Sequence, residues 1–128
     1  MKVVLDTNVL VSALINANGI PARILAQILN GKLKIAYDNR IIFEYFDVLS
    51  RKEFGFDSET IQSLINYVRM EGEYINADLS GEHFTDEADK KFYEVYLSSE
   101  AQYLITGNGK HFPQENTIIA PRELLEKI

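Results

Sequence analysis

Three acidic residues lie in apolar surroundings along the sequence and are candidates for chemistry. Asp6 directly follows the apolar run 3–5, Glu44 projects from an apolar face of a predicted helix, and Asp89 precedes Phe92 by about one helical turn. A carboxylate on a face that favours burial normally has a cation, a hydrogen-bond partner or a proton to offset its charge. We therefore expect such compensation at Glu44 and consider the three residues as candidates for one site.

A pocket lined by Asp6, Glu44 and Asp89 would bind a hard metal ion. The chain has no cysteine and only two histidines, so the ligands would be oxygen atoms, which suit Mg²⁺ or Mn²⁺ better than zinc. A metal held by carboxylates activates water and stabilises the charge that develops when a phosphodiester bond is cut. The residue types thus predict metal-dependent phosphodiester chemistry.

Asp6 and Glu44 also have structural interpretations. Asp6 begins an Asp-Thr-Asn triplet whose residues all favour helix starts, so it could serve only as a helix cap. Glu44 could lie exposed or pair with a basic side chain, for which the candidates are Arg23, Arg40 and Lys34.

The acidic stretch 86–89 offers two candidates with different expected roles. Its sequence, Asp-Glu-Ala-Asp, resembles a helix N-cap with an acidic third position, and acids in a first turn suit the helix dipole whatever the function. Asp89 has Phe92 and Tyr93 three and four residues later, so it faces the core side. We expect Asp89 in the site and Asp86 as a cap or accessory metal ligand.

Apolar runs alternate with amphipathic segments and predict the elements that position these acids. The alternation favours a parallel sheet with helices on both faces, in one domain over residues 1–128. Helix 39–50 is apolar nearly all round, so we expect it to be wedged between other elements. Expected strands cover 3–5, 33–37, 73–77, 103–105 and 117–120; expected helices follow Asp6, cover 22–30, 39–50 and 58–72, start at Asp86 or Asp89, and cover 122–127.

Strand order decides which polar residues meet. The carboxyl ends of parallel strands lie at one edge of a sheet, and ligands of open α/β sheets bind in the crevice outside them. Asp6 follows one expected strand, Asn108 follows another, and Asp86 or Asp89 lies at a helix start. We expect these three positions to converge at that edge.

The composition limits the possible partners. The 128 residues are 46% hydrophobic, enough for one domain with a sizeable core. The net charge of −6 argues against a broad basic surface for nucleic acid, although it is compatible with an acidic metal pocket. The stretch 71–89 carries seven acids and no Lys or Arg, which is typical of a solvated loop. No leader peptide and no apolar run of membrane-spanning length is present, so we expect a cytoplasmic protein with no membrane partner.

Four segments of the chain combine an acidic or amide residue with a strand or helix context: VVLDTNVLVSAL at 3–14, IFE at 42–44, DEADKKF at 86–92 and YLITGN at 103–108. Together they resemble the motifs of the PIN domain, the nuclease fold of VapC-type toxins in bacterial and archaeal toxin–antitoxin pairs. The first resembles the family's N-terminal signature, the second matches the segment with its helical glutamate, and the last two resemble the third and fourth acidic motifs. The resemblance covers nearly the whole chain and implies a three-layer α/β/α fold with a central, mainly parallel sheet of four to five strands.

The resemblance also implies an activity and partners. It implies a Mg²⁺- or Mn²⁺-dependent endoribonuclease that forms a homodimer and is blocked by a cognate antitoxin. It makes Asp6, Glu44 and Asp89 the metal ligands and water-activating groups, with supporting polar contacts from Thr7, Asn8 and Thr106. Two alternatives are a PIN nuclease of RNA processing without an antitoxin, and an inactive PIN-fold binding module.

The fourth motif departs from the family pattern, because many members have aspartate where this chain has Asn108. An amide oxygen still ligates Mg²⁺ but contributes no negative charge, so we expect a weaker ligand, one tight metal, and a second that arrives with the RNA phosphate. A subset of PIN-like toxins is similar in placing Thr-Gly-Asn before His-Phe-Pro, as at 106–108 and 111–113 here.

Basic side chains next in sequence to the acids are candidates for contact with RNA phosphates. These are Lys90, Lys91 and Lys110. His111 could be a general acid for the leaving oxygen, although we favour a loop histidine packed beside Phe112. We assign no role to His83.

Overall fold

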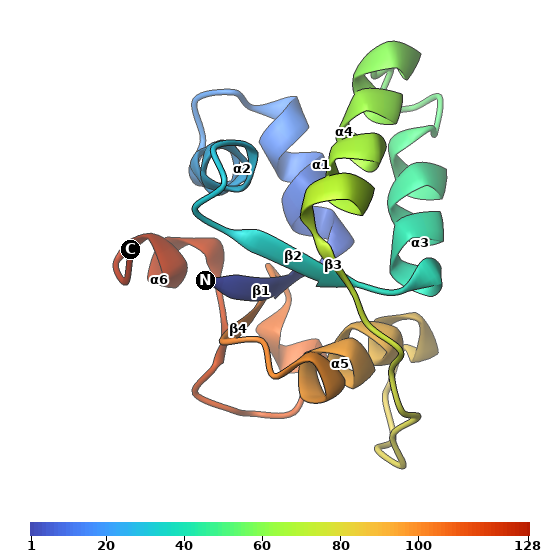
Figure 1. The fold of residues 1–128 in the computed structure, drawn as a ribbon, viewed down its shortest axis with the longest axis vertical. Helices are drawn as coiled ribbons and strands as arrows, with labels where there is room; N and C mark the ends of the chain where they lie inside the picture. The colour runs from blue at the N-terminus through green and yellow to red at the C-terminus, as the bar shows by residue number, and fades with distance from the viewer.

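A five-stranded parallel sheet forms the centre of the computed structural model, which describes residues 1–128 (Figure 1). The strand order is β3-β2-β1-β4-β5, and every neighbouring pair is parallel. The strands are β1 (Lys2–Leu5), β2 (Lys34–Tyr37), β3 (Glu73–Tyr74), β4 (Tyr103–Ile105) and β5 (Ile118–Ile119).

Helices cover both faces of this sheet. Figure 1 shows α1 to α4 on one side and α5 on the other, where α5 packs against β1, β2 and β4. The three-layer α/β/α fold with a parallel sheet is therefore confirmed. The helices are α1 (Thr7–Ile15), α2 (Ile20–Leu29), α3 (Asn39–Leu49), α4 (Ser58–Glu71), α5 (Glu87–Ser99) and α6 (Pro121–Leu125), with a short 3₁₀ helix η1 (Gly109–His111).

The β1 strand is buried on both faces because it lies at the middle of the three layers. Val3, Val4 and Leu5 are all fully buried, which explains why the strand is a continuous apolar run rather than an alternating one. One apolar cluster includes these residues and the inner faces of the helices.

The strand order creates a switch point between β1 and β4. From β1 the chain goes on to β2 and β3 at one side of the sheet, then crosses over to β4 and β5 at the other. Ligands of open α/β sheets bind in the crevice at such a point, outside the carboxyl ends of the strands. Asp6 follows β1 and Thr106 follows β4, so both residues lie at this crevice.

Several expected boundaries were wrong by a few residues. The β3 strand ends at Tyr74 rather than at 77, and β5 has two residues instead of four. The α2 helix starts at Ile20 and includes Pro21 in its first turn. A backbone N–H in the first turn has no acceptor within the helix, so the N–H that proline lacks is not missed there. The last helix ends at Leu125, and η1 was not expected.

The expectation that α3 is wedged between other elements was wrong on one face. Ile41, Tyr45 and Leu49 are fully buried, but Phe43 is 73% exposed and Phe46 is 45% exposed. Both rings line an open groove between α3 and α4, beside Gln62, Ile65 and Arg69, and α4 does not cover them.

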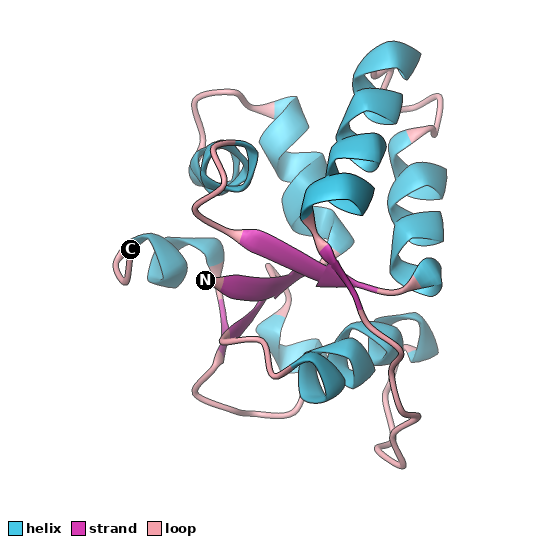
Figure 2. Cartoon of the chain, viewed as in Figure 1, coloured by secondary structure: helices cyan, strands magenta, loops and turns pink.

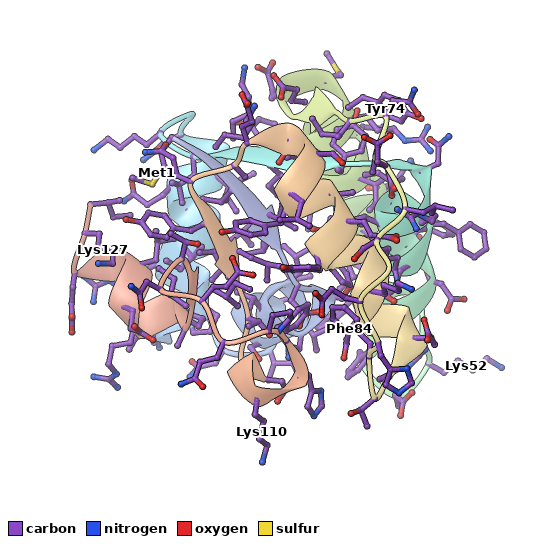
Figure 3. The ribbon with its side chains drawn as sticks, turned by 90° about the horizontal axis from the view of Figure 1, so that it is seen from below. Met1, Lys52, Tyr74, Phe84, Lys110 and Lys127 are labelled. Carbon is purple, nitrogen blue, oxygen red and sulfur yellow. The ribbon has the colours of Figure 1, made fainter.

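The acidic segment between β3 and α5 forms a long loop, visible beside α5 in Figure 2. Of the seven acids in the stretch 71–89, which runs from the end of α4 into α5 and includes this loop, five are exposed, as expected for a solvated stretch, whereas Glu73 and Asp89 are half-buried. The loop is held by Phe84, a buried ring 5.7 Å from Tyr93 between ring centres and labelled beside α5 in Figure 3.

No single helix of the chain has the length and apolar character needed to cross a membrane. The α1 and α2 helices meet these criteria only when counted together, and they are bent by 104° at the break between them.

Candidate active site

Asp6 turns its carboxylate toward β4 rather than capping a helix. It occupies the N-cap position of α1, yet its side chain makes no capping hydrogen bond. Its N–H donates to the Ile105 carbonyl at 2.9 Å, and its Oδ2 accepts a hydrogen bond from Thr106 Oγ1 at 2.7 Å. Asp6 is 6% exposed. The interpretation of Asp6 as only a cap is therefore not supported.

Glu44 reaches the same region from α3 and is bound on both oxygens. The Thr7 hydroxyl donates to Oε2, and the Lys91 ammonium lies 2.6 Å from Oε1. None of the three expected basic partners fills this role. Arg40, which was one of them, pairs with Asp38 and Glu94 instead.

Asp89 enters the site from the first turn of α5. Its Oδ2 is buried and has no hydrogen-bond partner. His111 Nδ1 lies 3.4 Å from that oxygen but is not aligned to donate to it. Asp86 is exposed and accepts from the Ala88 N–H at 2.9 Å, so it caps α5. His111 therefore lies beside the carboxylate of Asp89. The expectation of a loop histidine that only packs beside Phe112 did not include this contact.

Burial and neighbouring carboxylates disfavour the ionisation of Asp6 and Asp89. Burial raises the pKa of Asp6 from 3.8 to about 6, the charges of Asp89 and Glu44 add to this effect, and the Thr106 hydrogen bond opposes it. The pKa of Asp89 is also raised, first by burial and then by the charge of Asp86. Three acids brought together by β1, α3 and α5 therefore form one electrostatic cluster.

The expected supporting residues all contact the cluster or the backbone around it. Thr106 Oγ1, besides donating to Asp6, accepts from the Asn108 N–H at 3.0 Å. Asn8 Oδ1 accepts from the Gly107 N–H at 3.4 Å. The loop after β4 is therefore tied to Asp6 and Asn8, which follow β1. Asn108 itself is exposed at the start of η1, with no capping hydrogen bond from its side chain.

The three candidate lysines differ in their surroundings. Lys91 is 13% exposed and held by Glu44, which leaves it little freedom to reach a phosphate. Lys90 is half-buried, while Lys110 is exposed and projects away from the body of the molecule in Figure 3.

An ion-pair network beside the cluster was missed by the sequence reasoning. Arg40 Nη1 lies 2.7 Å from Glu94 Oε1, and its Nη2 lies 2.7 Å from Asp38 Oδ2. Glu94 Oε2 accepts from the Ser80 N–H at 2.6 Å, which ties the acidic loop to α5. The sequence feature that could have predicted this network is the run FYEVY at 92–96, where Glu94 interrupts an apolar stretch and therefore needs a buried partner.

The donor atoms of the cluster fit a hard cation. A buried carboxylate oxygen without a partner, such as Asp89 Oδ2, is costly unless a proton or cation satisfies it. Carboxylate oxygens from Asp6, Glu44 and Asp89 are the ligand type that Mg²⁺ and Mn²⁺ favour. In the present arrangement no three acidic or histidine side chains surround one point closely enough to hold an ion, and the Lys91 ammonium supplies the positive charge beside Glu44.

Comparison with known proteins identifies the family. The model of the PIN domain family matches residues 2–110. The chain is also 38% identical over 112 residues to an uncharacterized protein of Methanocaldococcus jannaschii, a match that covers 84% of this chain and 71% of that protein. The family match includes Asp6, Glu44, Asp89 and Asn108. The chain therefore belongs to the PIN domain family, and PIN domains form a superfamily of nucleases.

Proposed function

We propose that this protein is an endoribonuclease that depends on Mg²⁺ or Mn²⁺ and hydrolyses RNA phosphodiester bonds at the acidic cluster. The observation that carries the proposal is the buried Asp89 Oδ2, which accepts no hydrogen bond, beside Asp6 at the switch point of the sheet. Membership in a nuclease superfamily supports the same reaction class.

Asp6, Glu44 and Asp89 would hold the metal, with Asn108 as a weaker ligand and Asp86 as an accessory one. The bound ion would supply an activated water and would offset the charge that develops on the phosphate. The chain's own hydroxyls fix the ligands: Thr106 orients Asp6 Oδ2, and Thr7 orients Glu44 Oε2.

We further propose that the protein is the toxin of a toxin–antitoxin pair and acts in the cytoplasm as a homodimer. The resemblance of its motifs to VapC-type toxins supports this role. Phe46 on α3 and Met70 on α4 are exposed apolar side chains, of the kind that a protein partner would cover. Co-purification with the product of a neighbouring small gene tests the pair, and sedimentation tests the dimer. A nuclease of RNA processing would cleave RNA without such a partner.

Cleavage of a mixed pool of structured and single-stranded RNA tests the enzymatic proposal. Purified protein is incubated with Mg²⁺, Mn²⁺ or chelator, beside Asp6→Asn and the control Asp78→Asn, whose carboxylate lies in the exposed acidic loop. We expect cleavage that requires metal, disappears in Asp6→Asn and survives in Asp78→Asn. Absence of both cleavage and metal binding by calorimetry would favour the alternative of a PIN-fold binding module.

A further inference from the structure

A groove of about 530 Å³ opens beside the acidic cluster and runs along the outer face of α3. Glu44 and Lys91 line both the cluster and this groove, and Phe43, Arg40 and Arg51 line the part that leads away. Its volume lies within the range of small-ligand sites, about 300 to 1,000 Å³. We propose that this groove binds one nucleotide of single-stranded RNA next to the scissile position, with the base on Phe43 and the phosphate on Arg51; this rests on the proposed function.

Phe43 has the surroundings of a stacking platform rather than of a core residue. Its ring is 73% exposed, on the same helix as the adjacent Glu44. Phe54 and Phe56 stack on each other, and the other phenylalanines except Phe46 are buried. An exposed aromatic ring beside a cationic groove stacks unpaired bases of any identity, which is how single strands are commonly held.

Two arginines supply the positive charge of the groove. Arg51 is 52% exposed and meets Asp47 only at 3.7 Å, so a phosphate can replace that weak partner. Arg40 is held in place by Asp38 and Glu94, and 41% of its side chain is exposed.

The cations of this groove differ in how firmly they are paired. Arg40 is held by Asp38 and Glu94, and Lys91 is held by Glu44, whereas Arg51 meets Asp47 only at 3.7 Å. Another cavity of about 530 Å³, between α1, α2 and α4, contains carboxylates and no Lys or Arg among its lining residues. A phosphate therefore meets an available cation, Arg51, in the groove on α3 and none in that cavity.

A tryptophan probe tests the base contact directly, because the chain has no tryptophan. Phe43→Trp is titrated with an eight-nucleotide oligoadenylate in chelator, where no metal-dependent cleavage occurs. Phe46→Trp is the matched control, since Phe46 lies on the same helix, is also exposed and does not line the groove. We expect saturable quenching of tryptophan fluorescence in Phe43→Trp and none in Phe46→Trp.

Binding of labelled oligoadenylate, measured by anisotropy at several salt concentrations, tests the contributions of the two side chains. We expect Phe43→Ala to weaken binding about five- to 100-fold, the range for one stacked base. Arg51→Ala should weaken binding and lower the slope of log K against log salt by about one phosphate contact. Phe46→Ala should bind like the wild type, and a duplex of the same length should bind more weakly.

The outcomes separate this groove from the nuclease proposal. Wild-type affinity in both Phe43→Ala and Arg51→Ala, an unquenched Phe43→Trp, or no binding by the wild type would overturn the groove even if the protein cleaves RNA. Quenching confined to Phe43→Trp, in a protein that cleaves no RNA with either metal, would leave the groove standing and overturn the nuclease.

Discussion

The ammonium of Lys91 lies 2.6 Å from Glu44 Oε1 and joins α5 to α3 across the acidic cluster. The same ammonium also donates to the Ala88 carbonyl within α5. With 13% of its side chain exposed, Lys91 provides a built-in positive charge next to a proposed metal ligand. A divalent cation that binds Glu44 must compete with this ammonium.

We expect Lys91→Met to bind Mn²⁺ about three- to tenfold more tightly than the wild type, because removal of one nearby positive charge leaves the carboxylates more attractive to a cation. The same variant should lose about 1 kcal/mol of stability in chelator, since Glu44 loses its partner. Calorimetry with Mn²⁺ and thermal unfolding measure the two effects. Lys90→Met is the control, and weaker Mn²⁺ binding by Lys91→Met would show that the ammonium assists the metal instead of competing with it.

Asp6 should make the metal-free protein less stable at neutral pH. Its pKa is about 6 in the folded chain, raised chiefly by burial from 3.8. Between about pH 4 and 6 the folded chain therefore binds a proton that the unfolded chain has released, so the free energy of unfolding falls as the pH rises through that range. The pKa difference corresponds to about 2 to 3 kcal/mol above pH 6.

Asp6→Asn removes this penalty while keeping an oxygen that accepts from Thr106. We expect the variant to melt at a higher temperature than the wild type at pH 7.5 in chelator, and at nearly the same temperature at pH 4. Added Mg²⁺ should stabilise the wild type more than the variant. If the melting temperatures of the wild type and Asp6→Asn differ by the same amount at both pH values, the ionisation of Asp6 does not destabilise the folded chain.

The order of elements could be predicted because each strand is a short apolar run and each helix has its own apolar face. The limits of β3 and β5 could not, because a two-residue strand is defined by its neighbours. Glu73 and Tyr74 count as β3 only through their pairing with β2, at Ala36 and Tyr37. Such pairing depends on tertiary packing and leaves little trace in the local sequence.

The acids of the site could be predicted, but their partners could not. Asp6 and Glu44 stand out because a carboxylate interrupts an apolar pattern in each case. Lys91 is the partner of Glu44 because α5 packs beside α3 with that face toward it, an orientation that no local spacing determines. For the same reason the exposure of Phe43 depends on how α4 packs against α3, which the local sequence does not determine.

Arg40 should contribute more to stability than the other arginine of the groove. Burial alone would raise the pKa of Glu94, but the Ser80 N–H and Arg40 outweigh it and hold the pKa below its usual value. Arg40→Met would leave Glu94, only 2% exposed, as a buried charge without its cation. We expect a loss of about 2 to 4 kcal/mol, somewhat below the range for fully buried pairs because Arg40 is partly exposed.

Urea unfolding measures this loss, and limited proteolysis within 75–86 should be faster in Arg40→Met because the loop is tied to Glu94 through Ser80. Arg51→Met is the matched control: it removes an exposed pair with Asp47 and should cost less than about 1 kcal/mol. Equal losses in the two variants would contradict a structural role for the Arg40 network.

Thr106 should set the working pH of the site through its hydrogen bond to Asp6. Thr106→Val keeps the shape of a fully buried side chain but removes both the donor to Asp6 Oδ2 and the acceptor of the Asn108 N–H. The loss of a hydrogen bond that lowers the pKa of Asp6 should raise that pKa further. We expect a stability loss of about 1 to 2 kcal/mol and RNA cleavage that declines more at pH 6 than at pH 8. Thr106→Ser retains the hydroxyl and should restore the wild-type pH profile, whereas an unchanged profile in Thr106→Val would separate this hydrogen bond from the ionisation of Asp6.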